Sequence, residues 1–162
     1  MIELIRIDER LLHGQVVVGW GQRLDLDHYV VADDDLAVSD WEQDLYAGGL
    51  PESATAFFLT VEAAAARFRR VAERADRGAL LTRTTAAMRS LAEAGVLEGR
   101  AVNVGCLGAG EGRSRALDYV HLRPDEAEDL RAIAERAGPV TARDLPSSPE
   151  VDLERILDAL AR

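Results

Sequence analysis

Short apolar runs alternate with amphipathic helical patterns along this chain of 162 residues. Runs of β-branched and aliphatic residues predict strands at residues 1–7, 28–32, 54–59, 79–82, 100–104, 118–122 and 140–143. Apolar positions three and four residues apart predict helices at residues 14–24, 37–47, 61–75, 85–94, 124–137 and 151–160. Thr60 is a suitable N-cap for the third of these helices, and Gly95 is suited to end the fourth.

This alternation indicates one α/β domain over residues 1–162, with a mostly parallel central sheet of about seven strands covered by helices. Ligands of such sheets bind outside the carboxyl ends of the strands. The loops that follow the predicted strands are therefore the places to search for a site, at residues 8–13, 33–36, 60, 83–85 and 105–115.

Composition narrows the classes of function. The formal charge of −10 argues against nucleic-acid binding, which requires a basic face. All 19 basic residues are arginine, so a Schiff-base lysine and the lysine of a P-loop are excluded, and a response-regulator receiver is disfavoured. The single cysteine, Cys106, excludes an internal disulfide and a multi-cysteine metal site. No apolar run is long enough to span a membrane, and we expect neither a signal peptide nor direct membrane insertion.

The loop after the first predicted strand carries the strongest chemical pattern. His13 lies where a strand has ended and a helix is about to begin, and the free N–H groups of a helix N-terminus favour phosphate. Gly14 would let the backbone approach a ligand closely. Arg6 and Arg10 could hold the oxygens of a phosphoryl group, while Asp8 could accept a ring N–H of the histidine. A structural ion pair between Arg6 and Asp8 is an equally good interpretation.

Other polar positions allow plain structural explanations. His28 and His121 fall within predicted strands and are interpreted as sheet or surface residues. Thr84 could offer a hydroxyl to a phosphate or cap the following helix. The glycine-dense loop at 105–113 does not match a dinucleotide fingerprint, and a flexible turn is favoured over a loop that lines the site. The acidic run at 33–35 is interpreted as a polar strand end rather than a magnesium site.

The first loop also permits recognition of a family. Residues 6–15 read Arg-Ile-Asp-Glu-Arg-Leu-Leu-His-Gly-Gln, which closely resembles the signature of the IIB component of the mannose/fructose/sorbose family of the bacterial sugar phosphotransferase system. The resemblance continues through Val-Ala-Asp-Asp at 31–34, Trp41, Asn-Val-Gly at 103–105 and Arg-Asp-Leu-Pro at 143–146. The chain has Arg83 in the loop where relatives often have lysine.

The resemblance implies a mostly parallel sheet with helices on both faces and a cytoplasmic phosphocarrier. In such a protein His13 accepts a phosphoryl group from a phosphohistidine of the IIA component. It then passes the group to a sugar held by the membrane components IIC and IID. We expect Arg6, Arg10, Gly14, Gln15 and Thr84 to bind the phosphate and Asp8 to orient the ring, without a metal or other cofactor.

Two alternatives remain open from the sequence. The chain could be a phosphorylation-responsive regulatory or binding module of the same fold, with no role in sugar transport. It could also be an unrelated α/β enzyme that uses His13 as a general base.

Overall fold

The computed structural model describes residues 1–162 and has a seven-stranded sheet at its centre. The strands lie in the order β3-β2-β4-β1-β5-β8-β9, and every pair is parallel except β8 with β9. In chain order they are β1 (Ile2–Ile7), β2 (His28–Ala32), β3 (Thr55–Leu59), β4 (Gly78–Thr82), β5 (Val102–Val104), β8 (Val140–Ala142) and β9 (Val151–Asp152). The predicted α/β fold class is confirmed.

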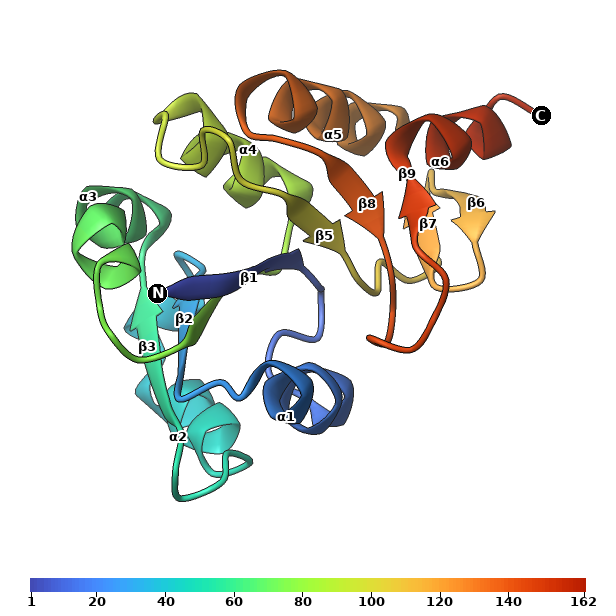
Figure 1. The fold of residues 1–162 in the computed structure, drawn as a ribbon. Coiled ribbons are helices and arrows are strands. Elements are labelled where there is room, and N and C mark those ends of the chain that lie inside the picture. The colour runs from blue at the N-terminus through green and yellow to red at the C-terminus, as the bar shows by residue number, and fades with distance from the viewer.

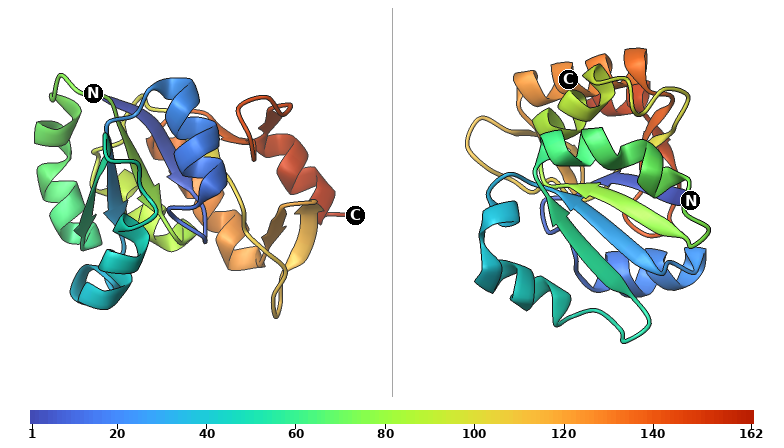
Figure 2. Two further views of the ribbon diagram at one scale, coloured as in Figure 1. Left: turned by 90° about the horizontal axis from the view of Figure 1, so that it is seen from below. Right: turned by 90° about the vertical axis from the view of Figure 1, so that its left-hand side faces the viewer.

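Helices cover both faces of this sheet (Figure 1). One face carries α3 (Val61–Ala72), α4 (Thr85–Glu93) and α5 (Pro124–Arg136). The other carries the π-helix η1 (Gln15–Trp20), which continues into α1 (Gly21–Leu24), and α2 (Asp40–Ala47), preceded by the 3₁₀ turn η2 (Leu36–Val38). The last helix, α6 (Leu153–Leu160), packs near β8 and β9 (Figures 1 and 2).

The period-two geometry of the strands divides the core into two layers. In β2, Val30 points into the cluster beneath α3, α4 and α5, whereas Tyr29 and Val31 point into the cluster beneath η1. All five residues of β2 are buried, which explains why the strand is an almost continuous apolar run.

Caps determine where several helices begin and end. The Thr60 hydroxyl accepts a hydrogen bond from the Ala63 N–H, so the predicted cap of α3 is confirmed. Gly95 has φ of +75° directly after the end of α4, a conformation that glycine adopts without steric cost. No helix of the structure is of the length and apolarity needed to cross a membrane.

Two predictions about the strands were wrong in detail. The strand predicted at 118–122 forms β7 (Val120–Leu122), which pairs antiparallel with β6 (Ser114–Leu117) in a separate two-stranded ribbon. The two segments are joined by a tight turn, and a tight turn permits only antiparallel pairing. The seventh strand of the central sheet is instead the two-residue β9, where the apolar spacing predicted the start of a helix.

Candidate functional site

The loop between β1 and η1 lies at the carboxyl edge of the sheet, where the sequence placed the site. Its first residues are anchored on both sides, because β1 lies between β4 and β5. The Asp8 N–H donates to the Thr82 carbonyl at 2.9 Å, and the Glu9 N–H donates to the Cys106 carbonyl at 3.0 Å. The loop therefore starts from a rigid position in the centre of the fold.

His13 and Asp8 face each other within this loop. His13 Nε2 is buried, lies 3.2 Å from Asp8 Oδ2 and makes no hydrogen bond of standard geometry. The His13 side chain as a whole keeps 17% of its surface exposed, and Nδ1 is left on the less buried side of the ring. A carboxylate at Nε2 favours the tautomer that carries its proton there and leaves the Nδ1 lone pair free.

Asp8 is held in its charged form. Burial raises the pKa of this carboxyl group, but the close contact with the His13 ring and the charge of Arg6 outweigh burial and lower the pKa to about 2. The Arg10 backbone N–H also donates to Asp8 Oδ1, at 3.1 Å. The loop is thus built around one carboxylate that is ionised at neutral pH.

Arg6 is fully buried, and all of its N–H donors are engaged. Nε and Nη2 donate to Asp8, at 3.2 and 2.9 Å. The remaining donors bind the Asn103 side chain and the carbonyls of Arg143 and Asp144. No N–H is left for a phosphate, so the predicted phosphate contact of Arg6 does not fit this geometry, and the alternative of a structural ion pair does.

Arg10, by contrast, is available. Its side chain is 41% exposed; Nε lies 3.4 Å from Asp8 Oδ1 and Nη2 donates to Gln15 Oε1 at 2.6 Å. Nη1 makes no hydrogen bond within the protein, so part of the guanidinium fork remains free. Gln15 therefore positions Arg10 through its amide oxygen, a role the sequence pattern did not specify.

The backbone that follows His13 offers further donors. The N–H groups of Val16 and Val17 both donate to the His13 carbonyl, whereas those of Gly14 and Gln15 have no backbone partner. A Cβ added at Gly14 would meet no atom within 4 Å, so the space above this residue is open. Leu11, two residues before His13, has φ of +53°, a sparsely populated region that is typical of loops in functional sites.

The loop at 105–113 lines the site, contrary to the favoured prediction of a flexible turn. The Cys106 N–H donates to Asp8 Oδ2 at 3.3 Å, and the Gly108 N–H donates to Glu9 Oε1 at 2.8 Å. Arg113 then links Glu9 to Glu126 of α5, at 3.1 and 2.7 Å. Sequence reasoning missed Glu9 and Arg113, because ion pairs of this sequence separation leave no local pattern.

A glycine is required at position 105 because the side chains of Arg6 and Asp8 lie close to its backbone. A Cβ built on it would lie 2.3 Å from Arg6 Nη2 and 2.5 Å from Asp8 Oδ2. Only a residue without a side chain allows the buried ion pair to pack against this strand end. The glycine of the Asn-Val-Gly segment could therefore have indicated a close contact in the sequence. It could not have indicated which residue makes that contact.

The remaining predicted residues lie at the same edge with structural partners. The Thr84 hydroxyl accepts from the Ala87 N–H at 3.1 Å as the N-cap of α4, which fits the capping alternative. Asp33 pairs with Arg83 at 3.0 Å and accepts from the Leu36 N–H, as expected of a polar strand end. No group of histidine, cysteine or acidic residues is arranged to hold a metal ion.

The chain is similar to known proteins along almost its whole length. Residues 2–161 match the family model described as "PTS system sorbose subfamily IIB component". The chain is 33% identical over 148 residues to the N-acetylgalactosamine-specific phosphotransferase enzyme IIB component 1 of Escherichia coli K12, covering 90% of this chain and 91% of that protein. The crystal structure of the N-acetylgalactosamine-specific IIB component 1 from Escherichia coli superposes with a TM-score of 0.84 at 31% identity, covering 94% and 99% of the two chains.

One further relative is longer than this chain. The mannose-specific EIIAB component of Escherichia coli K12 is 23% identical over 160 residues. The alignment covers 99% of this chain but only 49% of that protein. The present chain therefore corresponds to one part of a relative whose name combines the A and B designations.

Proposed function

This chain belongs to the sorbose subfamily of IIB components of the phosphotransferase system, and we propose that it carries a phosphoryl group on Nδ1 of His13. The donor is a phosphohistidine of a IIA component, and the acceptor is a sugar held by the membrane components IIC and IID. The observation that carries the proposal is the orientation of His13, whose buried Nε2 faces Asp8 at 3.2 Å while Nδ1 lies on the less buried side of the ring.

The transfer needs no proton movement at His13. The Nδ1 lone pair attacks phosphorus as the P–N bond of the donor breaks and the donor imidazole leaves. The phosphorylated ring keeps its proton on Nε2 and gains positive charge, which the ionised Asp8 at 3.2 Å stabilises. In the second step a sugar hydroxyl attacks the same phosphorus, its proton passes to solvent, and His13 leaves as the neutral imidazole.

Arg10 and the backbone of the loop stabilise the transferring group. Arg10 has free guanidinium N–H groups, and Gly14 and Gln15 have unpartnered backbone N–H groups beside His13. Such preorganised donors stabilise the charge of a phosphoryl group in its transition state. Arg6 acts indirectly, because it positions Asp8, and Asp8 in turn orients the His13 ring. A hydrogen bond from the Thr84 hydroxyl to the phosphate stays a prediction.

The partner assignment rests on the relatives. The EIIAB relative joins the A and B designations in one protein, which supports a IIA component as the donor for this chain. We propose that the acceptor is a sugar held outside this protein.

Phosphorylation by the upstream proteins tests the proposal. The protein is incubated with phosphoenolpyruvate, the general phosphotransfer proteins and a IIA component, and ³¹P and ¹⁵N NMR identify the modified atom. We expect one acid-labile phosphoryl group on Nδ1, absent from the His13→Ala variant. Labelling that persists in the variant would refute the site.

Adding membranes that contain IIC and IID distinguishes a role in sugar transport from a regulatory role. After their addition, a panel of sugars should include one that removes the label and becomes phosphorylated. A label that no sugar discharges would favour the regulatory alternative.

A further inference from the structure

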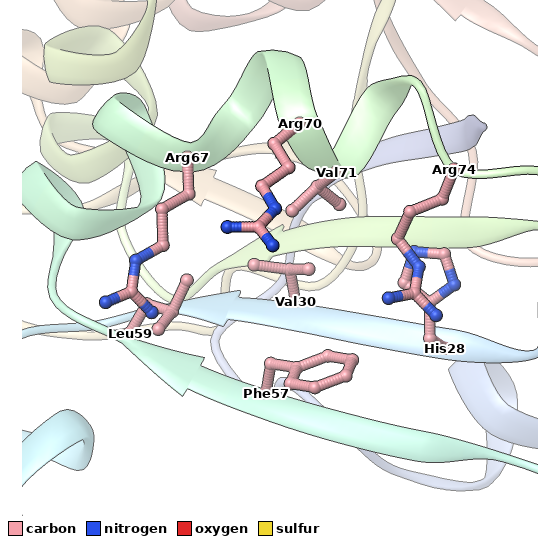
Figure 3. A pocket seen from close by; sticks show the side chains of 8 residues that line it. All are labelled: His28, Val30, Phe57, Leu59, Arg67, Arg70, Val71 and Arg74. Atoms are coloured by element: carbon pink, nitrogen blue, oxygen red, sulfur yellow. The ribbon is translucent and has the colours of Figure 1, made fainter.

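A groove of about 480 Å³ lies between α3 and the strands β2 and β3, apart from the His13 loop. Val30, Phe57 and Leu59 form the apolar part of its floor, and the buried His28 lies at one end (Figure 3); Phe57 is 39% exposed. Figure 3 shows three guanidinium groups, from Arg67, Arg70 and Arg74, that extend toward this floor. The groove is therefore apolar at its base and positively charged along one wall.

Two of the three arginines of this wall have no counter-charge within the chain. Arg67 and Arg70 make no ion pair, and no carboxylate lines the groove. Arg74 pairs with Asp76 and lies 5.9 Å from the centre of the Phe57 ring. Arg67 and Arg70 lie one turn apart on α3, and Arg74 follows shortly after the helix ends at Ala72, so the three side chains form a row along one wall of the groove. In a protein with a formal charge of −10, this row is a local site for an anionic partner.

The floor of the groove includes an unprotected sheet edge. β3 is the outermost strand and contains neither a charged residue nor a proline, and its register with β2 is uninterrupted. Proteins usually protect an edge strand with charge, proline or a bulge, because its free backbone groups pair with other chains.

The direction of the free backbone groups follows from the bonds to β2. The Thr55 N–H donates to the Asp27 carbonyl, and the Leu59 carbonyl accepts from the Asp33 N–H. Because backbone direction alternates along a strand, the N–H and C=O groups of Ala56 and Phe58 point away from the sheet. A strand added at this edge would bond to these two residues, and alternate side chains of it would lie beneath the arginine row.

We propose that this edge and groove bind an extended acidic segment of a partner protein, which adds a strand to β3 and places carboxylates against Arg67 and Arg70. Strand addition supplies backbone hydrogen bonds, and the arginine row selects acidic side chains. A second copy of this chain is disfavoured as the occupant, because pairing β3 with β3 would bring together two uncharged strands and two positive rows.

Binding of a designed peptide tests the proposal on the whole protein. The probe is a fluorescein-labelled eight-residue peptide of alternating valine and glutamate, measured by fluorescence anisotropy. We expect saturable binding that weakens as salt is raised, and at least about tenfold weaker binding to the Arg67→Glu/Arg70→Glu variant. The matched control is Arg69→Glu, on the same helix but outside the groove, which should bind as the unaltered protein does.

Strand addition is tested through the peptide backbone. Two further peptides carry N-methyl groups on alternate residues, one in each register. Only one of these two peptides should lose binding, because only half of the peptide N–H groups face β3. The Ala56→Pro variant, which removes an outward N–H, should also lose binding and keep its far-ultraviolet circular dichroism spectrum.

Several results would overturn the proposal. They are the absence of binding, equal binding of an alternating valine and lysine peptide, equal binding of both N-methylated peptides, full displacement by citrate alone, and self-association that blocks the peptide. His13→Ala should bind the peptide normally, so failure here is distinguishable from failure of the phosphocarrier proposal.

Discussion

Oδ2 of the buried Asp8 carboxylate lies 3.2 Å from Nε2 of His13. Asp8 comes directly after the central strand β1 and is fully buried, whereas His13 ends the loop at the protein surface. The contact therefore connects the rigid centre of the sheet to the proposed phosphoryl carrier. It also determines which ring nitrogen is open to a partner.

Replacing Asp8 should affect both stability and transfer. Asp8→Asn leaves the buried Arg6 guanidinium without its counter-charge, so we expect the free energy of unfolding to fall by about 3–5 kcal/mol. The His13 ring should also lose its preferred tautomer, and phosphorylation from IIA should slow. Urea unfolding and quantitative labelling measure the two effects.

A surface carboxylate provides the control for this variant. Asp118 pairs with Arg115 where both side chains are largely exposed, so Asp118→Asn should change the free energy of unfolding by less than about 1 kcal/mol. Equal stability of Asp8→Asn and Asp118→Asn would contradict the buried role of Asp8.

Gly105→Ala should destabilise the protein by displacing the Arg6–Asp8 pair. The added Cβ would lie 2.3 Å from Arg6 Nη2, so either the side chains or the strand end must move. Overpacking of this kind costs about 1–3 kcal/mol, and we expect the midpoint of thermal unfolding to fall accordingly. Differential scanning calorimetry measures the shift, and an unchanged midpoint would show that the pair is less constrained than the structure indicates.

Gly14→Ala should slow phosphoryl transfer without destabilising the protein. No atom lies within 4 Å of the added Cβ, and φ at Gly14 is −52°, so the folded state accommodates alanine. Thermal stability should be unchanged or slightly higher. Phosphoryl transfer from IIA should slow, because the methyl group occupies space above the free N–H groups. Normal transfer rates would remove Gly14 from the proposed phosphate site.

Arg10→Ala should slow phosphorylation without unfolding the protein. The side chain is 41% exposed, so the free energy of unfolding should change by only about 0.5 kcal/mol. Loss of a positioned donor to a developing charge commonly costs a factor of about 10²–10³ in rate. Rapid-quench measurement of labelling determines the rate, and Arg10→Lys should recover only part of it because lysine lacks the fork. An unaltered rate for Arg10→Ala would exclude the residue from the transfer step.

Stability should decrease toward mildly acidic pH because of His28. Burial lowers the pKa of this imidazole below its ordinary value of 6.5, so the folded protein holds it neutral. The unfolded chain takes up the proton first, and the His28 contribution is therefore fully present above pH 6.5 and is lost as the pH falls through the lowered pKa. Urea unfolding between about pH 8 and pH 5 should show this loss, and His28→Gln should reduce the slope. A slope that the variant leaves unchanged would assign the effect to other groups.

Local patterns were sufficient for most of the elements. The apolar run at 28–32 became β2 with the same bounds, and Thr60 became the cap of α3. They failed where pairing was not local. Nothing near Val120 reveals that its strand leaves the central sheet for β6, and β9 is too short to show a period.

The sequence by itself determined the fold class and the family and led to His13 as the proposed phosphoryl carrier, because these depend on residue periods and on a contiguous motif. Only the tertiary structure decided which contacts the side chains of that motif make. Arg6 is occupied by the carbonyls of Arg143 and Asp144, more than a hundred residues away, and so supports Asp8 instead of a phosphate. The physical reason is that a guanidinium has a fixed number of donors, and which groups engage them depends on segments brought together only when the chain folds.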